Sequence, residues 1–200
     1  MRKEPRQARS RATVEAIVQA GAHILGGRGL SGFTTNEVAD VAGVSIGSFY
    51  QYFPNKLALI EAIRRKHFDD VLAVLQQAVE SRSSPEQLVD GLVHGMISVH
   101  CINPALHRVL LDLPDIEGSR SAYDKFRAEY LRHYKVVMAA YQNRRAEAAD
   151  GIAAQVLSSA VEGVIHNAAR RGMLKLLKLK QELTKLVCSY LNRGTRSRDP

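Results

Sequence analysis

Four residues in the middle of the chain carry side chains of the kind that bind metal ions: His94, His100, Cys101 and His107. Spacings of six or seven residues along a helix separate side chains by about 9–10 Å, whereas zinc ligands lie about 2.0–2.3 Å from their ion. His100 and Cys101 are neighbours and therefore point to different faces of a helix. We expect no metal here, although a turn at Asn103-Pro104 that folds His107 back leaves a metal or redox sensor open.

Catalytic chemistry finds little support in the residue pattern. Cys101 with a nearby histidine lacks the Asp or Asn that orients a nucleophile–base pair. The glycines of residues 26–29 lack the Lys-Ser/Thr pair of a phosphate-binding P-loop and are typical of a helix end. We therefore expect no catalytic residue and no cofactor, and do not expect an enzyme.

The most informative stretch is TTNEVADVAGVSIGSFYQYFPNK, residues 34–56. A helix-turn-helix needs a small residue where its two short helices touch, a turn residue that accepts positive φ, and apolar residues that seal the pair. Ala39 is the small contact residue and Gly43 supplies the turn. Val38, Val44 and Phe49 supply the apolar seal. A structural helical hairpin also uses Gly and Ala, but the joint spacing favours the helix-turn-helix.

The second helix of this motif leaves a set of small, polar and aromatic residues at its N-terminus and outer surface: Ser45, Ile46, Gly47, Ser48 and Tyr50. Small polar side chains can approach phosphates and base edges, and the amides of a helix N-terminus favour phosphate oxygens. The motif therefore predicts binding to double-stranded DNA.

The elements that must position these residues are all helical. Apolar residues recur with helical rather than alternating spacing, and strand signals are weak throughout. Three short helices are expected before Pro54, and six further helices between Lys56 and about residue 191. The predicted fold is all-α, with a three-helix helix-turn-helix domain at residues 1–55 and a six-helix ligand-binding and dimerisation domain at 56–200.

Composition agrees with a nucleic-acid partner. The formal net charge is +8, which favours a polyanion such as nucleic acid or an anionic membrane surface. The two cysteines do not make a disulfide framework. Neither a signal peptide nor a run of about 20 apolar residues is present. We expect a cytoplasmic protein without a membrane partner.

The segment Ile24–Ile63 resembles the DNA-binding domain of the TetR/AcrR family of bacterial repressors, most clearly in the run VSIGSFYQYFPNKLALIEAI. The resemblance implies DNA contacts from the residues that match the family's motif: Thr35, Ser45, Gly47, Ser48, Tyr50, Tyr52 and Lys56. It implies phosphate contacts for Tyr50 and Lys56, and base-edge contacts for Gly47 and Ser48. Ile46 departs from the polar residues found there, and either touches a thymine methyl or contributes nothing.

A basic arm precedes the first expected helix. Against the single acid Glu4, it contains five cations: Arg2, Lys3, Arg6, Arg9 and Arg11. Such an arm can follow the DNA backbone or enter the minor groove. The alternative is a disordered, solubilising tail.

A tyrosine stripe marks the expected helix at about residues 119–142. Tyr123, Tyr130, Tyr134 and Tyr141 fall on one face within about 20°. Such a stripe is often core packing, but aromatic faces with hydroxyls also suit a small-molecule pocket. The residues predicted to bind this ligand are Met96, His100, Cys101, Phe126, Tyr130, Tyr134, Glu162 and His166. Arg127 and Arg132 are expected in solvent.

The last two long helices carry narrow stripes of small and apolar residues. Such helices can complete a monomer core, but the resemblance implies that they pair with their twins in a four-helix bundle. The predicted dimer interface comprises Val156, Ala160, Gly163, Val164, Leu183, Leu186 and Tyr190. A two-fold dimer also explains how one short recognition helix per chain reads enough sequence.

The sequence thus predicts a homodimeric repressor that binds palindromic operator DNA and releases it when a small, mainly apolar inducer binds. One alternative is a helix-turn-helix regulator without a small-molecule ligand, controlled by a protein partner, a metal or redox chemistry. Another is an enzyme with a vestigial helix-turn-helix, which would need a cleft of convergent titratable groups.

Overall fold

The computed structural model of the chain describes residues 7–81, 84–112 and 120–196, and every regular element within these ranges is an α-helix. This confirms the predicted all-α fold. The chain divides into two compact units. The first comprises residues 1–67 and 103–120, and the second comprises residues 68–102 and 121–200.

The first unit is built on α1 (Ala8–Arg28), α2 (Thr35–Val41), α3 (Ile46–Tyr52), the start of α4 (Lys56–Glu80) and α6 (Pro104–Asp112). Its core holds fully buried side chains from the helix-turn-helix and from α1 and α4, among them Ile17, Phe33, Phe49, Phe53 and Ile60. Burial of this apolar surface is what fixes α2 and α3, which are too short to be stable alone.

Local residues define where the short helices of this unit begin. The Thr34 hydroxyl accepts a hydrogen bond from the Glu37 amide at 3.3 Å, and the Ser45 hydroxyl accepts one from the Ser48 amide at 3.1 Å. Asn55 accepts from the Ala58 amide at 2.9 Å at the start of α4. Each satisfies an amide that the helix itself leaves without a partner.

The turn between α2 and α3 depends on Gly43. Its φ of +67° lies in the left-handed region that glycine adopts at little cost. In this conformation the Val44 amide donates to the Ala39 carbonyl at 3.0 Å, which closes the turn. The predicted turn residue Gly43 thus allows the residue that follows it to bond to Ala39, the predicted small contact residue.

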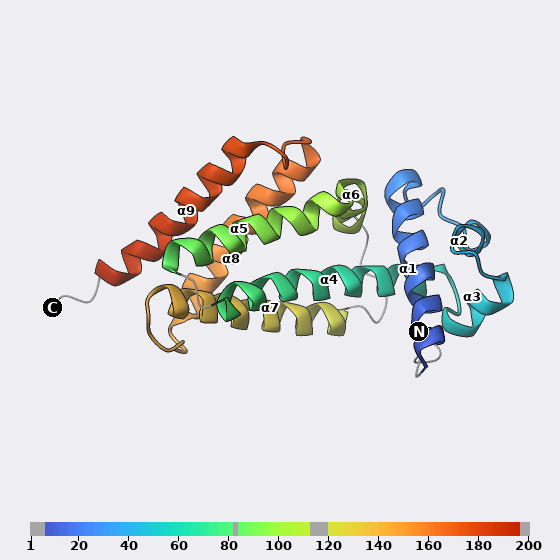
Figure 1. Cartoon of the computed structure of the whole chain (residues 1–200), viewed down its shortest axis with the longest axis horizontal. Coiled ribbons are helices and arrows are strands. Elements are labelled where there is room, and N and C mark those ends of the chain that lie inside the picture. Colours follow the sequence, from blue (N-terminus) through green and yellow to red (C-terminus); the bar gives the residue numbers. More distant parts are fainter. Residues whose placement is uncertain (1–6, 82–83, 113–119, 197–200) are drawn as a thin grey trace. The chain divides into compact units, whose positions relative to one another are not determined.

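The second unit contains the rest of α4, together with α5 (Pro85–Ile102), α7 (Arg120–Tyr141), α8 (Asp150–Arg170) and α9 (Leu177–Arg196). Figure 1 shows α5, α8 and α9 side by side, in agreement with their mutual contacts. The core between the helices contains aliphatic side chains and, less usually, the buried phenols of Tyr130 and Tyr134.

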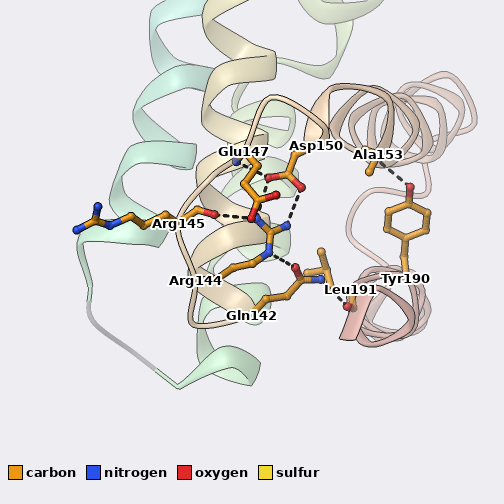
Figure 2. A network of polar contacts seen from close by, with 8 residues as sticks. All are labelled: Gln142, Arg144, Arg145, Glu147, Asp150, Ala153, Tyr190 and Leu191. Atoms are coloured by element: carbon orange, nitrogen blue, oxygen red, sulfur yellow. Dashed lines mark hydrogen bonds and ion pairs between the residues drawn. The ribbon is translucent and has the colours of Figure 1, made fainter. Parts of the chain in front are cut away.

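A polar network holds the loop between α7 and α8 (Figure 2). The Arg144 guanidinium donates two hydrogen bonds to the Asp150 carboxylate, at 2.7 and 2.8 Å, and a third to the Gln142 side chain at 2.7 Å. Gln142 in turn donates to the Leu191 carbonyl at 3.1 Å. The first turn of α8 is thereby connected to α9 through side chains of the loop.

The predicted division into residues 1–55 and 56–200 concerns function and stays a prediction. By packing, the first unit also takes in α4 as far as His67 and the helix α6. Within the described ranges, no helix is both long and apolar enough to cross a membrane.

Candidate DNA-binding surface and buried polar cluster

The outer surface of α3 carries the residues predicted to contact DNA. Tyr50 is 42% exposed and Ile46 is 39% exposed, although both are large side chains with apolar surface. Ser45, Gly47 and Lys56 are also exposed, while Thr35, Ser48 and Tyr52 are half-buried. The next residue after Ser48 in the helix, Phe49, is fully buried. One face of α3 therefore seals the core, and its other face presents polar and aromatic groups.

Two hydroxyl contacts hold this surface in place. The Tyr50 hydroxyl lies 3.1 Å from the Thr35 hydroxyl, which connects α3 to the first residue of α2. The Ser45 and Ser48 hydroxyls lie 2.9 Å apart at the start of α3. Edge-on packing of the Tyr50 ring against Phe49, with centroids 5.3 Å apart, further orients it. These side chains are thus oriented before any ligand binds.

The basic arm is described only in part. Arg2, Lys3 and Arg6 lie outside the described residues. Arg9 and Arg11 are exposed in the first turns of α1. The DNA-contacting role of the arm stays a prediction.

A second candidate site lies in the interior of the second unit. It begins with a row of aromatic rings: Phe68 stacks on Phe126 with centroids 4.0 Å apart, and Phe126 packs on Tyr130 at 5.3 Å. Tyr130 meets Tyr134 edge-on at 4.9 Å, and its hydroxyl donates to that of Tyr134 at 3.5 Å. We call the polar groups at this end, from Tyr130, Tyr134, His100, Glu162 and His166, the buried polar cluster.

Burial determines the charge states in this cluster. Desolvation lowers the pKa of His166 to about 4 and also lowers the pKa of His100, so both imidazoles are neutral near pH 7. Their rings lie 5.9 Å apart. Desolvation raises the pKa of Glu162, which forms an ion pair with Arg127 at 3.4 Å. The cluster therefore offers neutral hydrogen-bonding groups and one balanced carboxylate.

The tautomer of His100 follows from its contact with the backbone. Its Nδ1 lies 2.6 Å from the Met96 carbonyl oxygen. Because a carbonyl only accepts, Nδ1 carries the proton, and Nε2 of the neutral ring is the acceptor.

Most of the predicted ligand residues belong to this interior. Met96, His100, Tyr130 and Tyr134 are buried, and Phe126, Glu162 and His166 are half-buried. Cys101 is half-buried next to His100 and packs against the same core. Tyr123, predicted on the same stripe as Tyr130, is 46% exposed.

The expected solvation of Arg127 is wrong, whereas Arg132 is exposed as expected. Arg127 pairs with Glu162 across two helices, 35 residues apart in sequence. Phe68, which stacks on Phe126, was not predicted.

The predicted dimer residues differ in exposure. Val156 and Leu186 are 48% and 41% exposed, and Ile152, one turn before Val156, is 80% exposed. Gly163 is exposed, and Ala160, Val164 and Tyr190 are half-buried. Leu183, by contrast, is 2% exposed within the core of the unit. The Tyr190 hydroxyl donates to the Ala153 carbonyl at 3.3 Å, which ties α9 to α8 (Figure 2).

Two family models match separate parts of the chain. Residues 17–63 match a model described as bacterial regulatory proteins, tetR family, and residues 84–191 match a tetracyclin repressor-like C-terminal domain. The chain belongs to the TetR family. The first match, to bacterial regulatory proteins, contains the whole helix-turn-helix.

Individual relatives of this TetR-family chain agree with the assignment. The HTH-type transcriptional repressor KstR2 of Mycolicibacterium smegmatis is 32% identical over 78 residues, which are 39% of this chain and 38% of KstR2. The match thus spans well under half of that relative.

Solved structures share the fold at low identity. The fatty acid degradation regulator FadR of Bacillus halodurans is 18% identical, with a TM-score of 0.70 over 91% of this chain and 99% of FadR. FadR of Bacillus subtilis, solved in complex with stearoyl-CoA, is 15% identical, with a TM-score of 0.63 over 92% and 99%.

Proposed function

We propose that this TetR-family chain is a homodimeric repressor, which binds two-fold symmetric operator DNA and releases it when a small, mainly apolar molecule binds the second unit. The observation that carries the proposal is the division of α3, in which Ile46, Gly47 and Tyr50 are exposed while Phe49 is fully buried. Such a face is suited to the major groove, which admits one α-helix.

The residues around α3 divide by the part of DNA they suit. Tyr50 and Lys56 carry a hydroxyl and an ammonium group that suit phosphate oxygens, which position the protein. Gly47 and Ser48 are small enough to let α3 approach base edges, and Ile46 offers an apolar surface to a thymine methyl. Thr35, Ser45 and Tyr52 complete the proposed contact set.

Operator binding is tested by Lys56→Ala, with Lys66→Ala as the matched control. Both lysines are exposed on α4, ten residues apart. Lys56→Ala should weaken binding to all DNA sequences alike and reduce the salt slope of the binding constant by about one. Lys66→Ala should leave both unchanged. Gel-shift titrations at several salt concentrations measure the slope, and an unchanged slope for Lys56→Ala contradicts this docking.

The proposed dimer interface is the exposed apolar side of α8 and α9. Ile152, Val156 and Gly163 share one helix face, at spacings of four and seven residues, and Leu186 adds an exposed apolar side chain on α9. Contiguous exposed apolar residues are typical of an interface, and a two-fold axis places two recognition helices on successive half-sites.

Light scattering tests the dimer without ambiguity about folding. The chain has a mass of 22.1 kDa, so wild type should scatter as twice that mass at micromolar concentration. Val156→Glu and Leu186→Glu should shift it to one mass with unchanged helicity, because each places a charge in the interface. Leu183→Glu is the contrasting variant: its site is in the core, so loss of fold is expected. A wild-type monomer contradicts the proposal.

The proposed inducer site is the aromatic row and the buried polar cluster. A relative of the same fold was solved with stearoyl-CoA, which supports a ligand with a large apolar part. Tyr130→Phe and Tyr134→Phe remove one hydroxyl each with little change of shape, and Tyr141→Phe is the matched control on the same helix.

The inducer site is tested by titrating repressor–operator complexes with stearoyl-CoA and with uncharged lipophilic compounds. A compound that releases wild type should require at least tenfold more ligand for the two cluster variants and the same amount for Tyr141→Phe. Equal titrations for all three variants contradict the site.

A further inference from the structure

We propose that the first unit binds a divalent transition-metal ion, such as Zn²⁺, Co²⁺ or Ni²⁺, through the imidazoles of His67 on α4 and His107 on α6. The two rings pack against one another in a tilted arrangement, with centroids 5.2 Å apart and planes inclined by 52°. Each ring presents a nitrogen within 4.8 Å of the other.

The nitrogens, which lie within 4.8 Å of one another, must move closer together to share one ion. Two imidazole nitrogens bound at about 2.0–2.1 Å to one tetrahedral ion lie about 3.4 Å apart. A small rotation of either side chain covers the difference. The histidines come from helices about 40 residues apart in the chain, so the approach is produced by the fold and not by helical spacing.

The surroundings favour a borderline-soft ion over Ca²⁺ or Mg²⁺. His107 is 4% exposed and His67 is half-buried, so the pair is largely shielded from water. Neutral imidazole suits zinc, copper, iron and nickel, whereas Ca²⁺ and Mg²⁺ require oxygen ligands. Two protein ligands leave the remaining coordination positions to water or to other donors.

The positive charge of Arg64 opposes the binding of a cation nearby, and the negative charge of Glu61 compensates for it. Arg64 lies three residues before His67 on α4 and is 8% exposed, and its guanidinium lies 4.0 Å from the Glu61 carboxylate. Because the two charges are opposite and adjacent, their combined field at a third group is small. Binding therefore depends on the imidazoles.

An ion at this position would cross-link the unit that carries the helix-turn-helix. Asn103, just before α6, donates to the Ala22 carbonyl of α1 at 3.1 Å and accepts from the Leu106 amide at 2.9 Å. Gly26 of α1 packs so closely here that a Cβ would lie 2.7 Å from the Asn103 side chain. Since α6 is thus fixed to α1, joining it to α4 makes one rigid body of these three helices.

The test titrates chelator-treated full-length protein with Co²⁺, whose visible spectrum reports nitrogen ligands, and then displaces it with Zn²⁺. The variants are His67→Gln and His107→Gln, and the controls are the exposed histidines in His23→Gln and His94→Gln. Wild type and controls should bind one Co²⁺ per chain, with a rise in Tm on adding Zn²⁺. The two site variants should bind at least tenfold more weakly and show no rise in Tm.

Equal Co²⁺ spectra and affinities for wild type and His67→Gln overturn the proposal. His67 is half-buried, so this variant remains informative even where replacement of the buried His107 lowers stability; circular dichroism of each apo variant establishes that it is folded. No DNA is present in these measurements. Failure of the metal site is therefore distinct from failure of operator binding, which is read from gel shifts without added metal.

Discussion

The helix-turn-helix and the interior of the second unit differ in the burial of their polar side chains. Around α3, polar groups lie at the surface, where the hydroxyls of Tyr50 and Ser48 bond to those of Thr35 and Ser45. In the second unit, Tyr130 and Tyr134 are fully buried and His100 is 3% exposed. Substitutions of the exposed polar residues should therefore change the free energy of unfolding little, whereas substitutions of the buried polar residues should lower it.

The largest expected effect separates the two faces of α3. Phe49→Ala removes a fully buried ring and should lower the free energy of unfolding by about 3–5 kcal/mol. Tyr50→Phe, one residue on, should change it by less than about 0.5 kcal/mol, because the ring is retained and its hydroxyl is exposed. Urea unfolding measures both. Comparable losses in the two variants would remove the distinction between a sealing face and a binding face.

This difference also explains what the sequence could predict. Gly43, Ser45 and Phe49 lie within seven residues, and their roles follow from local rules for caps, turns and apolar spacing. The all-α fold and the family follow from the same kind of pattern. These features need no knowledge of how distant helices pack.

Tertiary packing produced the features that the sequence did not predict. Arg127 was expected in solvent because only its own helix was considered, and its partner Glu162 lies on α8. Phe68 meets Phe126 across 58 positions of the chain, and His107 meets His67 across 40. No local spacing encodes such contacts, because they depend on the rotation of each helix about its own axis.

The second prediction tests the buried polar cluster by pH. The folded-state pKa of His166 is lowered to about 4 from 6.5, so the unfolded chain binds more protons between these values. Stability is therefore complete above about pH 6.5 and falls as the pH decreases towards 4, by about 2 kcal/mol, because the half-buried ring is partly screened by solvent.

Urea unfolding between pH 4 and 7 measures this slope, with His166→Gln and the exposed-site control His23→Gln. His166→Gln should reduce the slope and His23→Gln should retain it. Glu162 contributes with the opposite sign, because its raised pKa destabilises the folded state as pH rises, while His100, whose pKa is also lowered, retains part of the slope in His166→Gln. An unaltered slope in His166→Gln means that this imidazole is solvated.

The third prediction concerns the loop between α7 and α8. Its polar network is less exposed than the exposed residues on α3 and less buried than Tyr130 and Tyr134. Asp150 is 8% exposed, but the Arg144 side chain is 20% exposed. Asp150→Asn keeps the shape and removes the charge, which should lower the free energy of unfolding by about 2 kcal/mol, less than for a fully buried pair. Combining it with Arg144→Gln in a double-mutant cycle should give a coupling of about 1–2 kcal/mol. A coupling near zero would show that Arg144 and Asp150 act independently.

The smallest effect on stability is expected at Gly47, which is exposed on α3, in contrast to the buried Gly21 of the same unit. A Cβ at Gly47 meets only the Ser45 hydroxyl, at 3.9 Å, whereas a Cβ at Gly21 would lie 2.9 Å from the Leu59 side chain. Gly47→Ala should therefore leave stability unchanged or raise it by up to about 1 kcal/mol, as alanine favours helix. Gly21→Ala should be destabilising, because Leu59 is fully buried and has little room to move.

The effects on DNA binding should have the opposite order. A methyl group on the exposed face of α3 should obstruct close approach to base edges and weaken operator binding at least tenfold, while folded Gly21→Ala protein should bind as wild type does. Thermal unfolding measures the stability of the two variants, and gel shifts on the same preparations measure their operator affinity. Full operator affinity in Gly47→Ala would mean that α3 does not approach the bases at this residue.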